Sequence, residues 1–252
     1  MARVIAIANL KGGVGRTNVC VNLSMFLSAL GKRVLLIDLS PQGDATFCLG
    51  IKSSPNFIGD VLIKKVKPKI AIRSTPYFGY DIIPSFPRLN ETISKLKGER
   101  KAEKRLDEAL DNIKDDYDFV IIDTPSDFNL LIANTLIAAD EIIIPVQCEH
   151  LALMGAKRLA NFVKSFKNLK DKKINILLTM YGWRSLLSRT IAKRTKKEFP
   201  NSVFNTIIPR AAILAQATES KEPILKSAPN SRASRAFRQL AEEVINSGKN
   251  KK

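Results

Sequence analysis

A glycine-rich stretch near the start of the chain has the residue types of a phosphate-binding loop. Residues 9–18 read NLKGGVGRTN, after an apolar run and before a segment with helical spacing. Glycines at a strand-to-helix turn let backbone N–H groups point inward, and the helix N-terminus adds positive potential, so the turn suits a phosphate. The usual G-x-x-x-x-G-K-[ST] pattern is missed at Leu10 and Arg16. The alternative is a plain glycine-rich connection between strand and helix.

Two acidic residues directly after apolar runs have the chemistry to organise a metal ion. Asp38 ends one run and Asp123 ends another. Ligands of open α/β sheets bind at the carboxyl ends of parallel strands, where P-loop NTPases place a Mg²⁺-organising carboxylate. We therefore expect Asp38 and Asp123 to flank the glycine-rich loop. Either residue alone could instead cap a helix, but the three segments together favour a site for a nucleotide and Mg²⁺.

The elements that must position these residues alternate between strands and helices. Apolar, mostly non-alternating runs predict strands at residues 3–8, 33–38, 80–85, 118–123, 141–146, 174–180 and 203–208. Continuous apolar runs are typical of strands buried on both faces. The sequence thus predicts an α/β fold, a doubly wound and mostly parallel sheet of about seven strands with helices on both faces. We expect one domain over residues 1–246 and a disordered basic tail over residues 247–252, and the pattern is weakest at residues 52–79.

Composition narrows the classes of partner. The 252 residues carry 41 Lys and Arg against 24 Asp and Glu, a formal net charge of +17. This excess favours a polyanionic partner, either nucleic acid or an anionic membrane surface, over a merely solvated basic surface. The longest apolar runs have five or six residues, so no membrane span is expected. Three widely spaced cysteines without a CxxC pair predict neither a disulfide framework nor a zinc site, and favour a cytoplasmic location.

Six segments, in order along nearly the whole chain, resemble successive blocks of the ParA family, the DNA-segregation ATPases with a deviant Walker A loop. They read KGGVGRT, IDLSPQGDAT, FVIIDTP, IIIPVQCEHLALMG, ILLTM and IIPR. The resemblance implies the fold predicted above, with ATP and Mg²⁺ as cofactors and ATP-dependent formation of a homodimer that holds two nucleotides between its subunits. It also implies nonspecific double-stranded DNA and a ParB-like centromere-binding protein as partners, and a place at the nucleoid.

The resemblance implies roles for individual residues of these blocks. Lys11 matches the family's signature lysine, which reaches the partner subunit's nucleotide, while Thr17 and Asp123 match the ligands of Mg²⁺. Pro209 and Arg210 fall in the block that lies against the adenine. The catalytic set implied is Lys11, Arg16, Asp38 and Asp123. The nucleotide-binding set implied is Lys11, Gly12, Gly13, Val14, Gly15, Arg16, Thr17, Asn18, Met180, Pro209 and Arg210.

Four positions depart from the family pattern. Arg16 stands where the family has Lys, and a planar guanidinium is not equivalent to an ammonium group at a phosphate. Ser40 stands where the family has a second Asp tied to hydrolysis, and a hydroxyl cannot supply a carboxylate. Asn18 replaces a common Thr, and Ser126 replaces a second Pro after Asp123. These substitutions predict weak turnover more than weak nucleotide binding.

Two helical segments carry basic residues at helical spacing. They are Arg189, Lys193, Lys196 and Lys197 in the first segment, and Arg232, Arg235 and Arg238 in the second. In the first segment Leu187, Ile191 and Phe199 form the expected buried stripe. A solvated surface is the ordinary interpretation of such charges, but the net charge favours a DNA-backbone footprint. The resemblance implies the same, because ParA dimers bind DNA without sequence preference through basic C-terminal surfaces.

Three alternatives to a partition ATPase each require a different feature of the sequence. A MinD-like membrane-surface regulator needs an amphipathic helix after the last core helix, and residues 247–252 contain no apolar side chain. An iron–sulfur reductase component like the nitrogenase iron protein needs two cluster cysteines per subunit, whereas Cys20 and Cys148 stand in other contexts. A nucleotide-locked DNA-binding module without useful turnover remains a variant of the partition ATPase.

Overall fold

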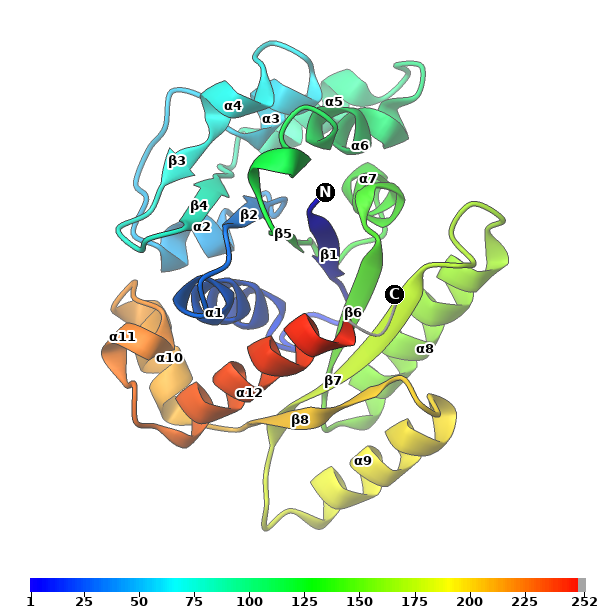
Figure 1. The fold of residues 1–252 in the computed structure, drawn as a ribbon. Helices are drawn as coiled ribbons and strands as arrows, with labels where there is room; N and C mark the ends of the chain where they lie inside the picture. Colours follow the sequence, from blue (N-terminus) through cyan, green and yellow to red (C-terminus); the bar gives the residue numbers. More distant parts are fainter. Residues whose placement is uncertain (249–252) are drawn as a thin grey trace.

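The computed structural model describes residues 1–248, and its centre is an eight-stranded sheet with the order β3-β4-β2-β5-β1-β6-β7-β8 (Figure 1). The strands are β1 Arg3–Ile7, β2 Val34–Asp38, β3 Arg73–Ser74, β4 Tyr80–Ile83, β5 Phe119–Asp123, β6 Glu141–Gln147, β7 Lys173–Tyr181 and β8 Val203–Pro209. All neighbours pair in parallel except β3, which is antiparallel to β4. The predicted fold class is therefore confirmed, with β3 as one strand more than expected, in the segment with the weakest pattern.

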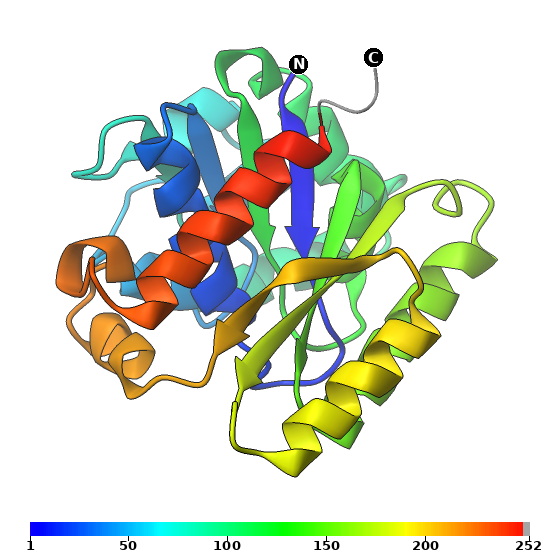
Figure 2. The ribbon, with the colours of Figure 1, turned by 60° about the horizontal axis from the view of Figure 1, so that its bottom comes forward.

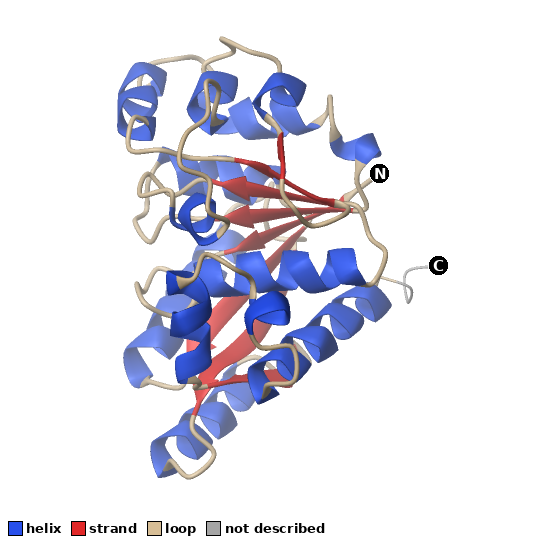
Figure 3. Cartoon of the chain, turned by 90° about the vertical axis from the view of Figure 1, so that its left-hand side faces the viewer, coloured by secondary structure: helices blue, strands red, loops and turns tan. Residues whose placement is uncertain are grey.

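Helices cover both faces of the sheet (Figure 3). The long helices α1 (Arg16–Ala29) and α12 (Arg232–Ser247) pack side by side on one face, and α7 (Leu130–Ala138) and α8 (His150–Ser165) lie on the other (Figures 1 and 2). The remaining α-helices are α2 Asp44–Cys48, α3 Ile58–Leu62, α4 Pro68–Ala71, α5 Leu89–Leu96, α6 Arg105–Leu110, α9 Leu186–Glu198, α10 Ala212–Glu219 and α11 Ile224–Ser227. Two 3₁₀ turns, Ala102–Lys104 and Lys114–Asp116, flank α6.

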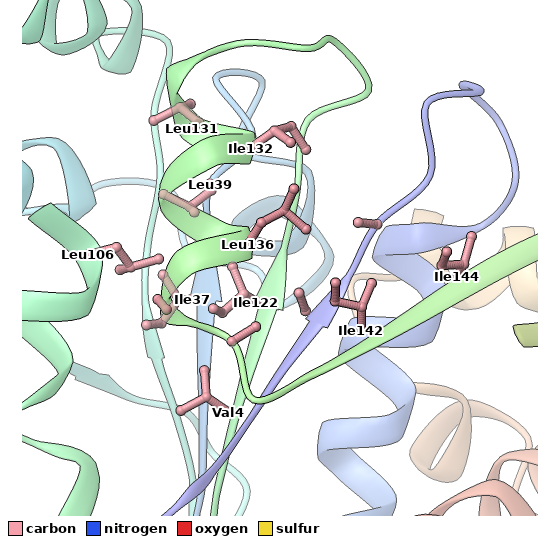
Figure 4. Packing of buried hydrophobic residues seen from close by; sticks show 14 of the residues in the cluster. Val4, Ile37, Leu39, Leu106, Ile122, Leu131, Ile132, Leu136, Ile142 and Ile144 are labelled. Atoms are coloured by element: carbon pink, nitrogen blue, oxygen red, sulfur yellow. The ribbon is translucent and has the colours of Figure 1, made fainter. Parts of the chain in front are cut away.

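Apolar side chains fill the space on each side of the sheet. Val4, Ile37 and Ile122 come from three neighbouring strands and belong to one buried cluster with Leu131 and Leu136 of α7 (Figure 4). Every residue of β2 and β5 is buried, because helices cover these strands on both faces. Each buried Ile or Leu contributes about 1.5–3 kcal/mol through the hydrophobic effect. This rigid centre fixes the loops at the carboxyl edge of the sheet.

The end of α12 differs from the sequence-based expectation. The disordered tail was expected from Ser247 onwards, but α12 includes Ser247, and Gly248 is the C-cap. Arg3 holds this end in place, because its Nη2 donates to Ser247 Oγ at 3.1 Å and its Nη1 donates to the Val244 carbonyl at 2.6 Å. Residues 249–252 of the expected tail lie outside the described residues. Within residues 1–248 the structure contains no helix with the length and apolar character needed to cross a bilayer.

Candidate functional site

The glycine-rich loop leaves the carboxyl end of β1 and enters α1. Gly13 and Gly15 have φ of 76° and 88°, the left-handed region that favours glycine, and Gly15 is the N-cap of α1. These turns direct the loop around the helix N-terminus, where backbone N–H groups are free to bind an anion. Lys11 is exposed, and its Nζ donates to the Gly12 carbonyl at 3.0 Å.

Two residues outside the predicted set fix the position of the loop, one through hydrogen bonds and the other by leaving room for them. Asn9 is fully buried, donates from Nδ2 to the Pro145 carbonyl at 2.7 Å, and accepts the Lys11 N–H on Oδ1 at 3.0 Å. Gly155 of α8 faces it, and a Cβ at this position would lie only 2.5 Å from Asn9 Oδ1. Sequence reasoning missed both residues. The only signal was a glycine inside a helical pattern, which often marks a close approach.

Arg16 makes contacts that the sequence did not predict. Its Nη1 donates to the carbonyls of Asn9 at 2.9 Å and Lys11 at 3.0 Å, and its Nε donates to the Thr124 carbonyl at 3.1 Å. The guanidinium thus ties the loop to the segment after β5. The ammonium group of a lysine cannot reproduce this fork-shaped set of donors.

Asp123 is the main electrostatic feature of the site. It ends β5 beside the loop, is fully buried, and neither carboxylate oxygen has a hydrogen-bond partner in the described part of the chain. Burial, followed by the neighbouring Asp38 carboxylate, raises the pKa of Asp123 to about 7, while Thr17 and Arg16 lower it by less. A buried carboxylate without donors is costly unless it coordinates a cation. With the neighbouring Thr17 hydroxyl it forms an all-oxygen donor set, which fits Mg²⁺.

Asp38 lies next to Asp123 but has other partners. The residues are in register on adjacent strands, with β5 between β2 and β1, so the expectation that Asp38 and Asp123 flank the loop is wrong. Both carboxylates lie on the same side of β1, since β2 is added outside β5. The Asp38 carboxylate accepts the N–H of Ser40 at 2.9 Å and the N–H and hydroxyl of Thr46 at 2.9 and 2.8 Å. It therefore organises the turn between β2 and α2.

Ser40 is buried in that turn and contacts an acidic residue that the sequence pattern did not indicate. Its Oγ donates to Asp44 Oδ2 at 3.1 Å, and its carbonyl accepts the Ser85 hydroxyl at 2.6 Å. Asp44 is only partly buried and raises the pKa of both Asp38 and Asp123. The turn thus carries a carboxylate near the site, although position 40 itself has none.

A largely apolar cavity of about 220 Å³ opens beside the loop. The predicted nucleotide residues that line it are Gly15, Asn18, Met180, Pro209 and Arg210. The structure thus brings together residues that are almost 200 positions apart in the sequence. Phe237 of α12 and Leu214 of α10 also line the cavity and were not predicted, because their spacing indicates only core packing.

The predicted basic residues are all exposed, three on α12 and four on α9. Two on α12 have partners in the protein, since Arg238 Nε lies 3.1 Å from Glu242 Oε1 and Arg235 Nη1 donates to the Asn230 carbonyl at 2.8 Å. The predicted stripe on α9 is wrong at Leu187, which is 54% exposed.

The buried face of α9 consists of Ser188, Ile191 and Thr195. Its two hydroxyl groups are satisfied locally, because Ser188 Oγ accepts the Gly182 N–H at 3.2 Å and Thr195 Oγ donates to the Ile191 carbonyl at 2.8 Å. Two polar residues therefore occupy positions that an apolar pattern does not predict.

The strand order, the loop between β1 and α1 and the unpartnered carboxylate on the adjacent strand place the chain among the P-loop NTPases. A family model described as an AAA domain matches residues 2–176. Among solved structures, cobyrinic acid a,c-diamide synthase from Mycobacterium smegmatis with bound ADP and magnesium superposes with a TM-score of 0.86 at 29% identity. That match covers 100% of this chain and 97% of the other.

The chain belongs to the ParA family of ATPases. It is 38% identical to the sporulation initiation inhibitor protein Soj of Bacillus subtilis, over 98% of this chain and 100% of that protein. It is 37% identical to the chromosome-partitioning ATPase Soj of Thermus thermophilus, over 96% of this chain and 95% of that protein. The resemblance seen in the sequence blocks is thereby confirmed.

Proposed function

We propose that the protein is a ParA-type switch in which ATP and Mg²⁺ close two copies into a dimer that binds duplex DNA without sequence preference. Residues 1–246 act as one ATPase domain, working with a ParB-like partner on plasmid or chromosomal DNA at the nucleoid. The observation that carries the proposal is the buried Asp123 carboxylate, whose oxygens accept no hydrogen bond of normal geometry within residues 1–248 and which lies beside the Thr17 hydroxyl at the loop.

Each part of the site has a task in this proposal. Thr17 and Asp123 hold Mg²⁺, which draws electron density from the phosphate oxygens when bound. The N–H groups of residues 12–17 surround the phosphates, and the apolar cavity at Met180 and Pro209 receives the adenine. Lys11 is exposed on the loop, from which its side chain can reach the nucleotide of a second subunit.

Hydrolysis is slow in this proposal. Phosphoryl transfer depends on positioned charge, and two charged groups of the site differ from the family pattern. Arg16 is engaged by three backbone carbonyls, and position 40 has a hydroxyl in place of a carboxylate. The same observations favour the second candidate, a nucleotide-locked DNA-binding module without useful turnover.

The dimer is tested by light scattering with ATP–Mg²⁺, with ADP–Mg²⁺ and without nucleotide. We expect a dimer with ATP alone, and a monomer for Lys11→Ala that still binds nucleotide, because the variant loses the cation that bridges the subunits. Lys95→Ala, which removes an exposed lysine on α5, is the matched control and should dimerise normally. The same mass for wild type and Lys11→Ala in ATP contradicts the proposal. DNA binding measured in the three nucleotide states then shows whether dimerisation controls it.

A further inference from the structure

A second cavity, of about 320 Å³, lies between α12 and the loop that joins β7 to α9. Its walls include Trp183, Pro209, Arg232, Arg235 and Gln239. Trp183 is 60% exposed, and its ring meets the buried Tyr181 edge-on with the centroids 4.9 Å apart. An indole supported by another aromatic ring and open on its other side is available for contact with a ligand.

The lining has a definite chemistry. It offers two guanidinium groups, one carboxamide and one aromatic face, and no carboxylate is among the described residues of its walls. Arg235 uses Nη1 on the Asn230 carbonyl, and in residues 1–248 Arg232 makes no ion pair or side-chain hydrogen bond. Guanidinium groups match the geometry of phosphate oxygens. The cavity therefore suits a ligand that combines an anionic group with a non-polar ring.

The position of the cavity points to a long ligand. Figure 2 shows β8 lying between α9 and α12, the helices that carry the two basic faces. Ile207 and Pro209 of β8 form one wall of the cavity, so it lies on the path from one basic face to the other. Pro209 also lines the apolar cavity beside the glycine-rich loop, so the two cavities share a wall.

We propose that this cavity receives one deoxyribose-phosphate unit of a DNA backbone strand, with the phosphate on Arg232 and Arg235 and the sugar against the indole of Trp183. The inference rests on the DNA binding proposed above and names where the backbone lies. Contacts to sugar and phosphate fix the position of a duplex and carry no sequence information, which suits binding without sequence preference. The indole adds a non-ionic contact to a footprint otherwise made of charge.

Trp183 is the only tryptophan of the chain, so its emission reports on this cavity alone. The probe is a duplex of arbitrary sequence, added to the ATP–Mg²⁺ form of the full chain, with acrylamide as quencher. Binding is followed independently by the anisotropy of a labelled duplex. We expect the duplex to protect Trp183 from acrylamide with the same concentration dependence as the anisotropy change.

Substitutions separate the two kinds of contact. We expect Trp183→Ala to weaken duplex binding about fivefold at every salt concentration without changing the salt slope, because an indole releases no counterions. Trp183→Phe should restore most of the affinity. Arg232→Gln with Arg235→Gln should flatten the slope of log K against log[salt] by about 0.9 for each phosphate that the protein no longer neutralises. The matched controls are Phe78→Ala, which removes an aromatic that is 98% exposed, and Arg100→Gln, which removes an exposed arginine elsewhere.

Each contrary outcome has a distinct meaning. Duplex binding by anisotropy without protection of Trp183 overturns the inference and leaves the proposed function standing. No duplex binding in any nucleotide state overturns the proposed DNA binding and the inference together. Stronger protection by single-stranded DNA indicates stacking on a base and overturns the assignment to the backbone. Protection by polyglutamate that also displaces the duplex identifies a site for acidic peptides and overturns the inference as well.

Discussion

Charged side chains at the carboxyl edge of the sheet are held by hydrogen-bond partners, whereas those on the surface of α9 and α12 are mostly exposed to solvent. At the edge, Arg16 has three carbonyl acceptors and Asp38 has three donors, so each group is fixed by its neighbours. On the surface, basic side chains extend into solvent with few partners. Residues in one bonded network act as a unit, whereas separated charges act additively. The two regions should therefore respond differently to substitution.

The largest effect is expected at Asp123. Asp123→Asn removes the negative charge that holds Mg²⁺, so ATP hydrolysis should fall by about 100-fold or more, the scale seen when one main electrostatic group of an active site is removed. Phosphate release measures it, and Asp127→Asn, at an exposed position in the same segment, is the control. Turnover of Asp123→Asn within threefold of wild type would show that Asp123 takes no part in hydrolysis.

An intermediate effect is expected where the edge departs from the family pattern. Arg16→Lys and Ser40→Asp should each raise turnover about tenfold, equivalent to about 1.4 kcal/mol of barrier, and the double variant should exceed either. Single-turnover hydrolysis measures the rate of each variant and shows whether the double variant is the fastest.

If both single substitutions lower turnover, Arg16 and Ser40 belong to a working site of another design. In that case, loss of turnover in Asp44→Asn would identify Asp44 as the carboxylate that acts in this site, because Asp44 accepts the Ser40 hydroxyl. Asp44→Asn without any effect on turnover leaves Asp44 outside the reaction.

Smaller and additive effects are expected on the surface. Reversing Arg189 and Lys193 to Glu should weaken duplex binding about tenfold and flatten the salt slope, with dimerisation unchanged. Reversing Arg235 and Arg238 should cost less, because Arg238 already pairs with Glu242. Titration of unrelated duplexes across a salt series measures both, and reversal of Lys95 is the control. A strong preference for one sequence, or no loss in either double variant, contradicts the footprint.

The contrast between the regions also explains what the sequence could predict. The loop and Asp123 were found because strand-to-helix turns and strand ends have fixed chemistry at fixed spacing. The strand order was not available from spacing, so the sequence could not show that β5 lies between β2 and β1 and that Asp38 and Asp123 therefore do not flank the loop. The contacts of Arg16 with Thr124, and of Asn9 with Pro145 and Gly155, join segments more than 100 residues apart, and no local pattern encodes such contacts.

The smallest effect, and the sharpest test of the buried edge, is the pH dependence of stability. Burial raises the pKa of Asp123 to about 7 and that of Asp38 to about 6, from an ordinary value of 3.8. Between pH 3.8 and about pH 7 the folded chain therefore binds more protons than the unfolded chain, so the free energy of unfolding falls as pH rises. The ligand-free protein should therefore melt several degrees lower at pH 8 than at pH 5, at about 2–4 °C per kcal/mol for a chain of this size. Asp123→Asn should remove most of this slope, Asp127→Asn should keep it, and ATP–Mg²⁺ should offset it at high pH by binding the ionised carboxylate. A melting temperature in the wild type that is constant or rises over this range would show that Asp123 is charged and already compensated in the free protein.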